Sequence, residues 1–240
     1  MNKLLLLFTL APCLAFGQTT LIPDANFEQR LIDLGYDTGT PDGSVPTANI
    51  SSVTYLDVAT KNISDLTGIQ DFTALTYLDC WNNQLTSLDV SNNTALTYLN
   101  CYQNQLTSLD VSAITALTQL RCQSNQLTSL DLRNGNNTNF TDGACTNNPN
   151  LYCIDVDNAV WSSANWTVAN GNINSWNNFS NNCATAFGCT DSLACNYDPL
   201  ATIYDSTCAF PTSNTTTATA CDTYTWDGTA YTTSGTYTNT

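Results

Sequence analysis

Hydrophobic positions recur along the middle of the chain with a spacing of 21 residues. The stretch LTYLDCWNNQLTSLDVSNNTA begins at Leu75, and close copies of it begin at Leu96 and Leu117. Within each copy, apolar and polar residues alternate over a few positions, which predicts a short strand with one buried side. The fixed period predicts that each copy adds one strand to a parallel stack, and that the apolar residues of all copies share one core.

Weaker copies flank the three clear ones. VTYLDVATKNI begins at Val53, and FTDGACTNNPN from Phe140 keeps the cysteine and the asparagine of the pattern. The clear copies read L-x-x-L-x-C-x-x-N-x-L, which resembles the leucine-rich-repeat signature with cysteine at the third apolar position. We therefore expect an α/β-type solenoid, mostly β, with a curved parallel sheet over residues 53–150. The short return segment of each copy predicts turns and short extended pieces on the convex side.

The asparagine of each copy is expected to be structural. These residues follow the strand at the point where the chain turns, so their amides are placed to satisfy backbone groups there. The column consists of Asn83, Asn104, Asn125 and Asn148.

Both ends of such a stack expose apolar core and unpaired strand edges, so each end needs a cap. In residues 18–52, Phe27, Leu31 and Leu34 fall on one helical face. Asp24 is placed to cap that helix and Gly35 to end it. We expect this segment to be the N-terminal cap.

Residues 151–183 are expected to form the C-terminal cap. The segment alternates like a strand from Leu151 to Val156. Four aromatic residues that follow are interpreted as the core of this cap rather than as a ligand site: Trp161, Trp166, Trp176 and Phe179.

The first 17 residues read as a secretory signal peptide. Lys3 precedes an apolar run from Leu4 to Phe16, with Gly17 as the expected cleavage position. Proline directly before Cys13 fits a lipoprotein cleavage box poorly. The run is too short to span a bilayer, and no later stretch is long enough, so we expect a secreted or cell-surface protein without membrane insertion.

Charge and composition exclude several classes of function. Beyond the signal peptide, four basic residues oppose twenty acidic ones, so nucleic acid and anionic membranes are poor partners. The chain has no histidine, which excludes His-dependent catalytic triads and ordinary His-containing zinc sites. Aspartate pairs could in principle catalyse glycoside hydrolysis, but repeated solvent-facing aspartates do not provide a cleft carboxyl with a raised pKa. We expect a protein that is not an enzyme.

The eleven cysteines fall into groups by spacing. Cys80, Cys101, Cys122 and Cys145 share the inward repeat position and are interpreted as small buried core residues, since neighbouring strands hold them slightly too far apart for a relaxed disulfide. Cys153 and Cys183 bracket the C-terminal cap, and we predict a disulfide between them. Of Cys189, Cys195 and Cys208, two are expected to pair locally. Cys221 has no visible partner.

Two sets of acidic residues allow a calcium interpretation and a plainer one. Asp89, Asp110 and Asp131 form a column in the return segments, for which solvent exposure with turn capping is sufficient and a calcium ladder is the alternative. Nearer the C-terminus, a second set has oxygen ligands suited to calcium without EF-hand spacing, and the alternative is a turn at Asn196-Tyr197-Asp198-Pro199. That set is Asp191, Asn196, Asp198 and Asp205.

The concave face carries the candidate binding residues. Its outward columns are Tyr55, Tyr77, Tyr98 and Gln119; Asp57, Asp79, Asn100 and Arg121; and Ala59, Trp81, Tyr102 and Gln123. Exposed aromatic residues on a rigid sheet suit recognition of protein or sugar. Cross-strand stacking that only favours strand formation is the alternative. The expected contact residues are Tyr55, Tyr77, Asp79, Trp81, Tyr98, Asn100, Tyr102 and Arg121.

With these residues in view, residues 21–183 resemble exported leucine-rich-repeat proteins of Bacteroidetes-type bacteria, with an internalin-like arrangement of cap and repeats. Residues 184–211 resemble a small cysteine-containing module of such surface proteins, and residues 212–240 the start of a Thr/Tyr-rich β module. The resemblance implies an N-terminal fragment of a larger adhesin-like protein that recognises an extracellular protein or polysaccharide. We expect the protein to need no cofactor and to be monomeric. A passive spacer that displays downstream domains is the alternative, and downstream sequence could contain an enzyme.

Overall fold

The computed structural model describes residues 17–210, 224–226 and 229–231. The chain divides into two compact units, with the boundary between Asn181 and Asn182. Residues 1–16 of the expected signal peptide lie outside the described residues, and so does Cys221. Within the described part, none of the helices has the length and apolar character that a membrane crossing requires.

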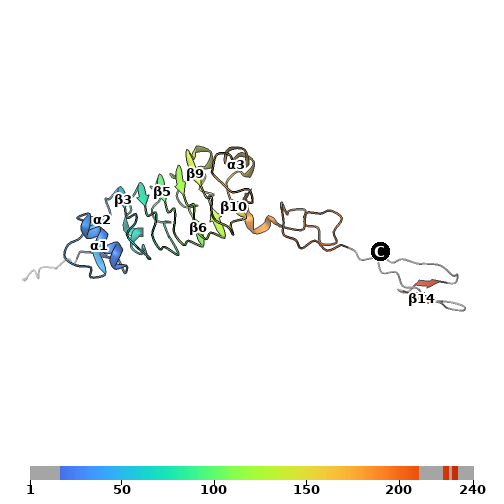
Figure 1. The fold of residues 1–240 in the computed structure, drawn as a ribbon, viewed down its shortest axis with the longest axis horizontal. Coiled ribbons are helices and arrows are strands. Elements are labelled where there is room, and N and C mark those ends of the chain that lie inside the picture. Colours follow the sequence, from blue (N-terminus) through green and yellow to red (C-terminus); the bar gives the residue numbers. More distant parts are fainter. Residues whose placement is uncertain (1–16, 211–223, 227–228, 232–240) are drawn as a thin grey trace, which may run out of the picture. The chain divides into compact units, whose positions relative to one another are not determined.

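The first unit consists of short strands with a few helices (Figure 1). In chain order it contains β1 (Thr19–Leu21), α1 (Ala25–Asp33), β2 (Ser44–Pro46), α2 (Thr47–Ile50), β3 (Tyr55–Asp57), the 3-10 helix η1 (Ile69–Asp71), β4 (Tyr77–Asp79), β5 (Tyr98–Asn100), β6 (Ser108–Asp110), β7 (Gln119–Arg121), β8 (Ser129–Asp131), the 3-10 helix η2 (Asn137–Asn139), β9 (Asp142–Ala144), β10 (Cys153–Asp155), α3 (Ala159–Asn165) and β11 (Asn178–Ser180).

The second unit contains the 3-10 helix η3 (Cys183–Thr185), the parallel pair β12 (Phe187–Gly188) and β13 (Ile203–Tyr204), and the antiparallel pair β14 (Tyr224–Trp226) and β15 (Thr229–Tyr231).

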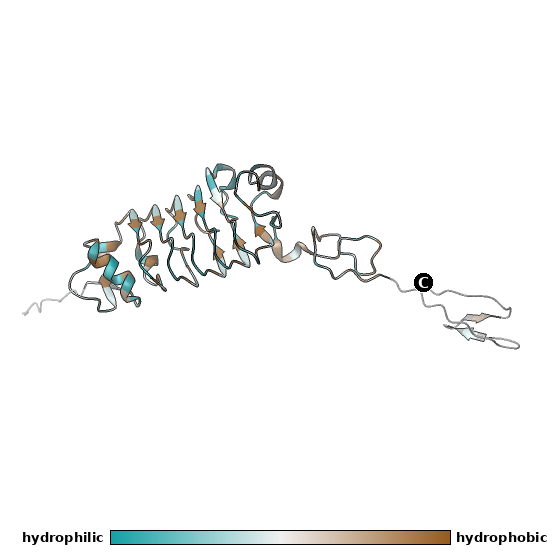
Figure 2. Ribbon diagram, in the orientation of Figure 1, coloured by the Kyte–Doolittle hydropathy of each residue, from teal (hydrophilic) through white to brown (hydrophobic). Residues whose placement is uncertain are grey.

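The repeats form a parallel five-stranded sheet in the order β3-β4-β5-β7-β9. Its register aligns Leu56 with Leu78, Leu99 and Leu120, so the apolar residues of successive repeats stack on one side of the sheet. Figure 2 shows these hydrophobic positions lining up from strand to strand. The mostly-β leucine-rich-repeat solenoid expected from the sequence is confirmed.

The return segments are more regular than the sequence suggests. β6, β8, β10 and β11 form a second parallel sheet, in the order β11-β10-β8-β6. Leu109, Leu130 and Ile154 are at most 2% exposed, and they pack into the same core as the leucines of the first sheet. Burial of one such side chain contributes about 1.5–3 kcal/mol, so the S-L-D motif encodes a strand as well as a turn.

The asparagine column is structural, as expected. Asn104 donates from Nδ2 to the carbonyl oxygens of Cys80 and Cys101 at 3.0 and 3.1 Å, and its Oδ1 accepts from the backbone N–H of Leu85 at 3.0 Å. The same pattern recurs at Asn83, Asn125 and Asn148. Each amide therefore joins its own repeat to the preceding one.

The repeat cysteines are buried thiols, which confirms the interpretation as core residues. Cys80, Cys101, Cys122 and Cys145 are at most 7% exposed and are not in disulfides. Burial raises the pKa of all four thiols, and for Cys101 and Cys145 it reaches about 12. These groups stay protonated and serve as small apolar side chains.

The N-terminal cap follows its sequence signals. The Asp24 carboxylate accepts from the backbone N–H groups of Asn26 and Phe27 at the start of α1. Gly35, with a φ of 81°, lies just past the end of the helix in the left-handed region that glycine favours. Glu28, the only glutamate of the chain, is 1% exposed, and its two oxygens accept from the N–H groups of Asp42 and Gly43.

The C-terminal cap is built around Trp166, which is 7% exposed. Trp161, Phe140 and Phe179 surround its ring with centroid distances of 5.5 to 5.8 Å. Trp176 differs from the expectation, because it is 42% exposed and does not belong to this core. It precedes Asn177, whose amide donates to the carbonyl oxygen of Leu151, and the chain turns there before β11.

Candidate binding surface

The outward side of the five-stranded sheet presents three rows of side chains, each of which runs across the strands. The strands bring Tyr55, Tyr77, Tyr98, Gln119 and Asp142 into one row, since each is the register partner of the next. The second row is Asp57, Asp79, Asn100, Arg121 and Ala144. The third row lies just past the strand ends and contains Trp81 and Tyr102. We call Tyr77, Trp81, Tyr98 and Tyr102 the aromatic strip.

The tyrosines of the first row stack face to face. The ring centroids of Tyr55 and Tyr77 are 4.4 Å apart, and those of Tyr77 and Tyr98 are 4.2 Å apart with planes 4° from parallel. The ring of Tyr77 is thus covered on both faces, while Tyr55 at the end of the row is 55% exposed. The cross-strand stacking considered from the sequence is present. It leaves Tyr77 and Tyr98 only partly exposed to solvent.

Burial changes the protonation behaviour of Tyr77 in this row and of Asp79 beside it. Burial raises the pKa of Tyr77 well above its ordinary value, and its interactions with Tyr98 and with the Asp79 charge act in the same direction. Burial also raises the pKa of Asp79, against the effect of hydrogen bonds from Trp81 and Asn100. Tyr77 is therefore a neutral hydrogen-bonding group at physiological pH.

The second row consists largely of residues that cap the strand ends. The carboxylates of Asp57 and Asp79 accept from the backbone N–H two residues ahead, at 3.0 and 3.2 Å. Asn100 makes the same bond to Tyr102 and is only 7% exposed. Asn100 was expected to border the contact surface, but its burial leaves it little area for a ligand. Its role in the structure is to hold the turn that carries Tyr102.

Arg121 is held by an ion pair that the sequence analysis missed. Its guanidinium donates to the carboxylate of Asp142 at 2.6 and 2.9 Å, and this bond is the main reason why its pKa is raised. Asp142 lies three residues before the repeat cysteine Cys145, the same offset that separates Tyr77 from Cys80. That offset was the signal that could have identified it. Both side chains are substantially exposed, so the pair contributes only about 0.2–1 kcal/mol.

The third row supplies an aromatic pair that is less tightly stacked. The ring centroids of Trp81 and Tyr102 are 6.3 Å apart with planes 18° from parallel, and Tyr102 is 36% exposed. Asn82 and Gln103, the residues that follow them, have φ values of 52° and 56°. This repeated left-handed turn fixes the direction in which both rings leave the sheet. At 6.3 Å the two rings cover each other less than the tyrosines do, so ring surface is open to a ligand.

The acidic column of the return segments caps turns, which is the plainer of the two interpretations from the sequence. Asp89, Asp110 and Asp131 each accept from the backbone N–H two residues ahead, at 2.8 to 3.0 Å. Asp131 also binds Arg133, which interacts with Asp155 as well. No group of three or more acidic, cysteine or histidine side chains placed to hold a metal occurs in the described part of the chain.

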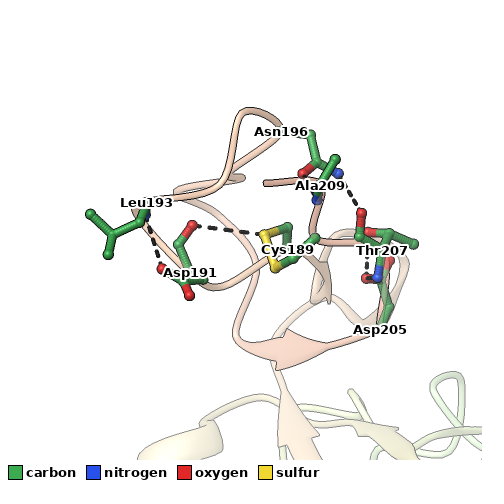
Figure 3. The surroundings of a disulfide bond; sticks show 8 residues. Cys189, Asp191, Leu193, Asn196, Asp205, Thr207 and Ala209 are labelled. Atoms are coloured by element: carbon green, nitrogen blue, oxygen red, sulfur yellow. Dashed lines mark hydrogen bonds between the residues drawn. A yellow bond between two sulfur atoms is a disulfide. The ribbon is translucent and has the colours of Figure 1, made fainter. Parts of the chain in front are cut away.

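In the second unit, the four candidate calcium ligands each serve a turn or loop of their own, and Figure 3 shows Asp191, Asn196 and Asp205 among them. Asp191, Asp198 and Asp205 accept from the N–H groups two residues ahead. Asn196 bridges to the backbone of Thr207 and Ala209. The calcium site remains a prediction, for which a higher melting temperature in calcium than in chelator is the test.

One local disulfide joins Cys189 to Cys208, as expected, and leaves the exposed Cys195 with a free thiol. Cys153 and Cys183 are both disulfide-bonded. Their pairing with each other remains a prediction.

Comparison with known proteins gives matches in structure. Neither a protein-family model nor a curated protein sequence matches the chain. The functional domain of InlJ from Listeria monocytogenes, which includes a cysteine ladder, is 35% identical with a TM-score of 0.49, and the match covers 58% of this chain and 33% of that one. This chain thus spans about a third of that protein domain.

Two further internalins of Listeria monocytogenes are similar over a comparable stretch. InlF is 22% identical with a TM-score of 0.43, and the match covers 57% of this chain and 52% of InlF. InlC2 is 14% identical with a TM-score of 0.40, and the match covers 59% of this chain and 80% of InlC2.

Proposed function

We propose that this chain is an extracellular binding protein, exported through the signal peptide at residues 1–17, that contacts a protein or polysaccharide with the aromatic strip. The observation that carries the proposal is the registered aromatic array on the solvent side of the five-stranded sheet. Large rings with few rotatable bonds bind at low entropic cost, and a rigid sheet holds them in place before the ligand arrives.

The two aromatic rows have different parts in this contact. Tyr77 and Tyr98 are partly exposed, and a phenol group can both donate and accept, so these residues are suited to contact with a polar surface. Trp81 and Tyr102 have more open ring area and are suited to act as anchors. Of the second row, Asp79 and Arg121 border the strip and contribute charge at its edge.

A passive spacer is the second candidate, and the tyrosine stacking favours it. Rings separated by 4.2 Å stabilise neighbouring strands whether or not a ligand is present. The spacer does not need the Trp81 and Tyr102 pair, whose wider spacing contributes less to the sheet. These two residues therefore distinguish the two functions.

The experiment replaces Trp81 and Tyr102 together by alanine and measures binding to immobilised extracellular-matrix proteins and polysaccharides beside the wild type. Loss of a central anchor should weaken a true contact by about 2 kcal/mol, roughly 30-fold in affinity. Tyr152→Ala is the matched control, because Tyr152 is 50% exposed but lies outside the five-stranded sheet.

Circular dichroism and the melting temperature establish that the double variant is folded. Binding that falls in the double variant and persists in Tyr152→Ala supports the proposal. If the folded double variant keeps its affinity for every ligand that the wild type binds, the aromatic strip is not the binding site and the spacer function is favoured.

A further inference from the structure

An open groove lies beside β6, the edge strand of the second sheet. The groove lies between the return segment 87–91 and the strand β6, and it has a volume of about 310 Å³. Its lining consists of Ser87, Leu88, Asp89, Ser91, Ser108, Asp110, Ser112 and Ala113. We call it the Ser108 groove. It lies among the return segments, whereas the aromatic strip occupies the outward side of the other sheet.

The groove exists because two successive return segments do not pair. The segments of the next two repeats are joined by hydrogen bonds from Thr128 to Thr107 and from Val111 to Asp131 around the pair β6–β8. Segment 87–91 is not part of the second sheet, so β6 is the edge strand of that sheet. Leu88 is half-buried, whereas its repeat counterpart Leu109 is 2% exposed. The preceding repeat has D-L-T at residues 65–67, the place that corresponds to S-L-D, and the 3-10 helix η1 follows, so no regular strand precedes segment 87–91.

The open edge of β6 has unpaired hydrogen-bonding capacity. In a parallel pair, alternate residues of a strand direct both backbone groups to the same neighbour. The Thr107 carbonyl and the Val111 N–H bind β8, so Thr107, Leu109 and Val111 face β8. Ser108 and Asp110 then direct their N–H and C=O groups into the groove. An edge of this kind is a template for another extended chain.

The groove is also negatively charged. Asp89 and Asp110 line it from its two sides, and each uses one carboxylate oxygen to cap its own turn. Hydrogen bonds from Ser91 lower the pKa of Asp89, so this carboxylate is ionised. Among the described ion pairs, none includes Asp89 or Asp110, and the guanidinium of Arg133 is bound by Asp131 and Asp155.

We propose that the Ser108 groove binds an extended peptide segment of a cationic partner protein, which adds as a strand to the open edge of β6. Backbone groups of Ser108 and Asp110 pair with the peptide backbone, and lysine or arginine side chains at alternate positions meet the carboxylates of Asp89 and Asp110. Alternate residues of a strand lie on one side, so a basic residue at every second position matches this arrangement. A second copy of this chain is a poorer occupant, since its net charge is −15.

The test uses the full chain and a synthetic peptide of alternating threonine and lysine, TKTKTKT, with blocked ends. Isothermal titration calorimetry measures its affinity. Two peptides serve as controls: TSTSTST lacks the charge, and TKTKTKT with N-methyl groups on alternate backbone nitrogens keeps the charge but loses half of its donors. Amide hydrogen exchange reports whether the N–H groups of Ser108 and Asp110 become protected.

Variants of the protein separate backbone pairing from charge. Ser108→Pro removes the N–H that faces the groove, at an edge position where proline is tolerated, and Ser108→Ala is its control because it keeps the N–H. Asp89→Asn and Asp110→Asn remove charge and keep the capping oxygen. Asp65→Asn is their control, since Asp65 caps Thr67 in a return segment outside the groove.

The expected result is binding of TKTKTKT with a dissociation constant below about 1 mM, weakened about tenfold by Ser108→Pro, by peptide methylation and by the double change of Asp89 and Asp110 to asparagine. Ser108→Ala, Asp65→Asn and Trp81→Ala should bind as the wild type does. Retained binding in Trp81→Ala separates this site from the aromatic strip.

Several results would overturn the proposal. These are no binding of TKTKTKT below about 1 mM, equal binding of the methylated peptide, or an equal loss in Asp65→Asn, which would show a general charge effect. Unprotected amides at Ser108 and Asp110 in the bound state would also overturn it. If Ser108→Pro does not fold, the methylated peptide and the exchange measurement decide alone.

Discussion

Asp24 binds Ser64 across the junction between the N-terminal cap and the first repeat. One oxygen of its carboxylate accepts from both the backbone N–H and the hydroxyl of Ser64, each at 2.8 Å, while the other caps α1. Burial alone would raise the pKa of Asp24, but hydrogen bonds from Ser64, Phe27 and Asn26 outweigh burial and lower it below 3.8. One carboxylate thus starts a helix and attaches it to the solenoid.

Asp24→Ala should lower the free energy of unfolding by about 2 kcal/mol, because it removes a helix cap and the bridge to Ser64. Urea denaturation at pH 7 measures the change. Asp33→Ala is the control, since Asp33 is exposed and binds only Gln29 in the described structure. An equal loss in both variants would contradict the bridge.

The Asp24 contribution should depend on pH. Because the folded pKa lies below the unfolded one, the stabilisation is complete above about pH 5 and is lost as the pH falls through the folded pKa. The stability difference between wild type and Asp24→Ala should therefore shrink between about pH 5 and pH 2. Denaturation series at several pH values test this, and a constant difference would speak against it.

Asn104→Ala should destabilise the protein by about 3 kcal/mol or more. It leaves two buried carbonyl groups and the N–H of Leu85 without their partner, and each such group costs about 1–3 kcal/mol. Gln105→Ala, an exposed neighbour, should change stability by less than about 0.5 kcal/mol. A small effect at Asn104 would mean that water replaces the amide.

The thiols of the four repeat cysteines should resist alkylation in the folded protein. Burial raises the pKa of Cys101 to about 12, so at pH 8 only about one thiol in ten thousand is ionised, and reagent cannot reach it. Iodoacetamide should label Cys195 in the native state and the four repeat cysteines only after unfolding. Peptide mapping identifies the labelled residues. Native labelling of Cys101 would show that the core opens locally.

Cys153 and Cys183 should appear in one disulfide-linked peptide. The predicted bond closes a loop of 31 residues. A loop of that size corresponds to roughly 3 to 4 kcal/mol in the chain-entropy model. Peptide mapping under non-reducing conditions identifies the pair, and recovery of either residue with a different partner would refute the assignment.

The repeat made most of the solenoid predictable. A cysteine at the third apolar position of each clear repeat and an asparagine three residues later identify strand, core and turn without reference to tertiary contacts. Cys80 and Asn83 occupy those places in the structure. Asp24 and Gly35 marked the ends of α1 for similarly local reasons. Patterns with a local physical cause can be recognised in a single sequence.

Features that depend on neighbouring elements were less predictable. The S-L-D motif is identical in the repeats of Leu88 and Leu109, yet only the latter belongs to a strand, because pairing depends on the adjacent return segment. Trp176, expected in the core of the C-terminal cap, is exposed. Asn100, expected at the contact surface, is buried. Asp142 was overlooked because its repeat has lost its leucines. The binding role of the aromatic strip stays a proposal, since stacking alone accounts for the tyrosines.

The asparagine column also determines how the solenoid responds to mechanical load. Asn104 holds the carbonyl groups of its own repeat and of the one before it, and Asn125 continues the same connection to the next repeat. Pulling one repeat out of line therefore breaks bonds in both neighbours, so extension should proceed in steps of several repeats rather than one. We therefore expect neighbouring repeats to resist tension together and to unfold cooperatively above a threshold force.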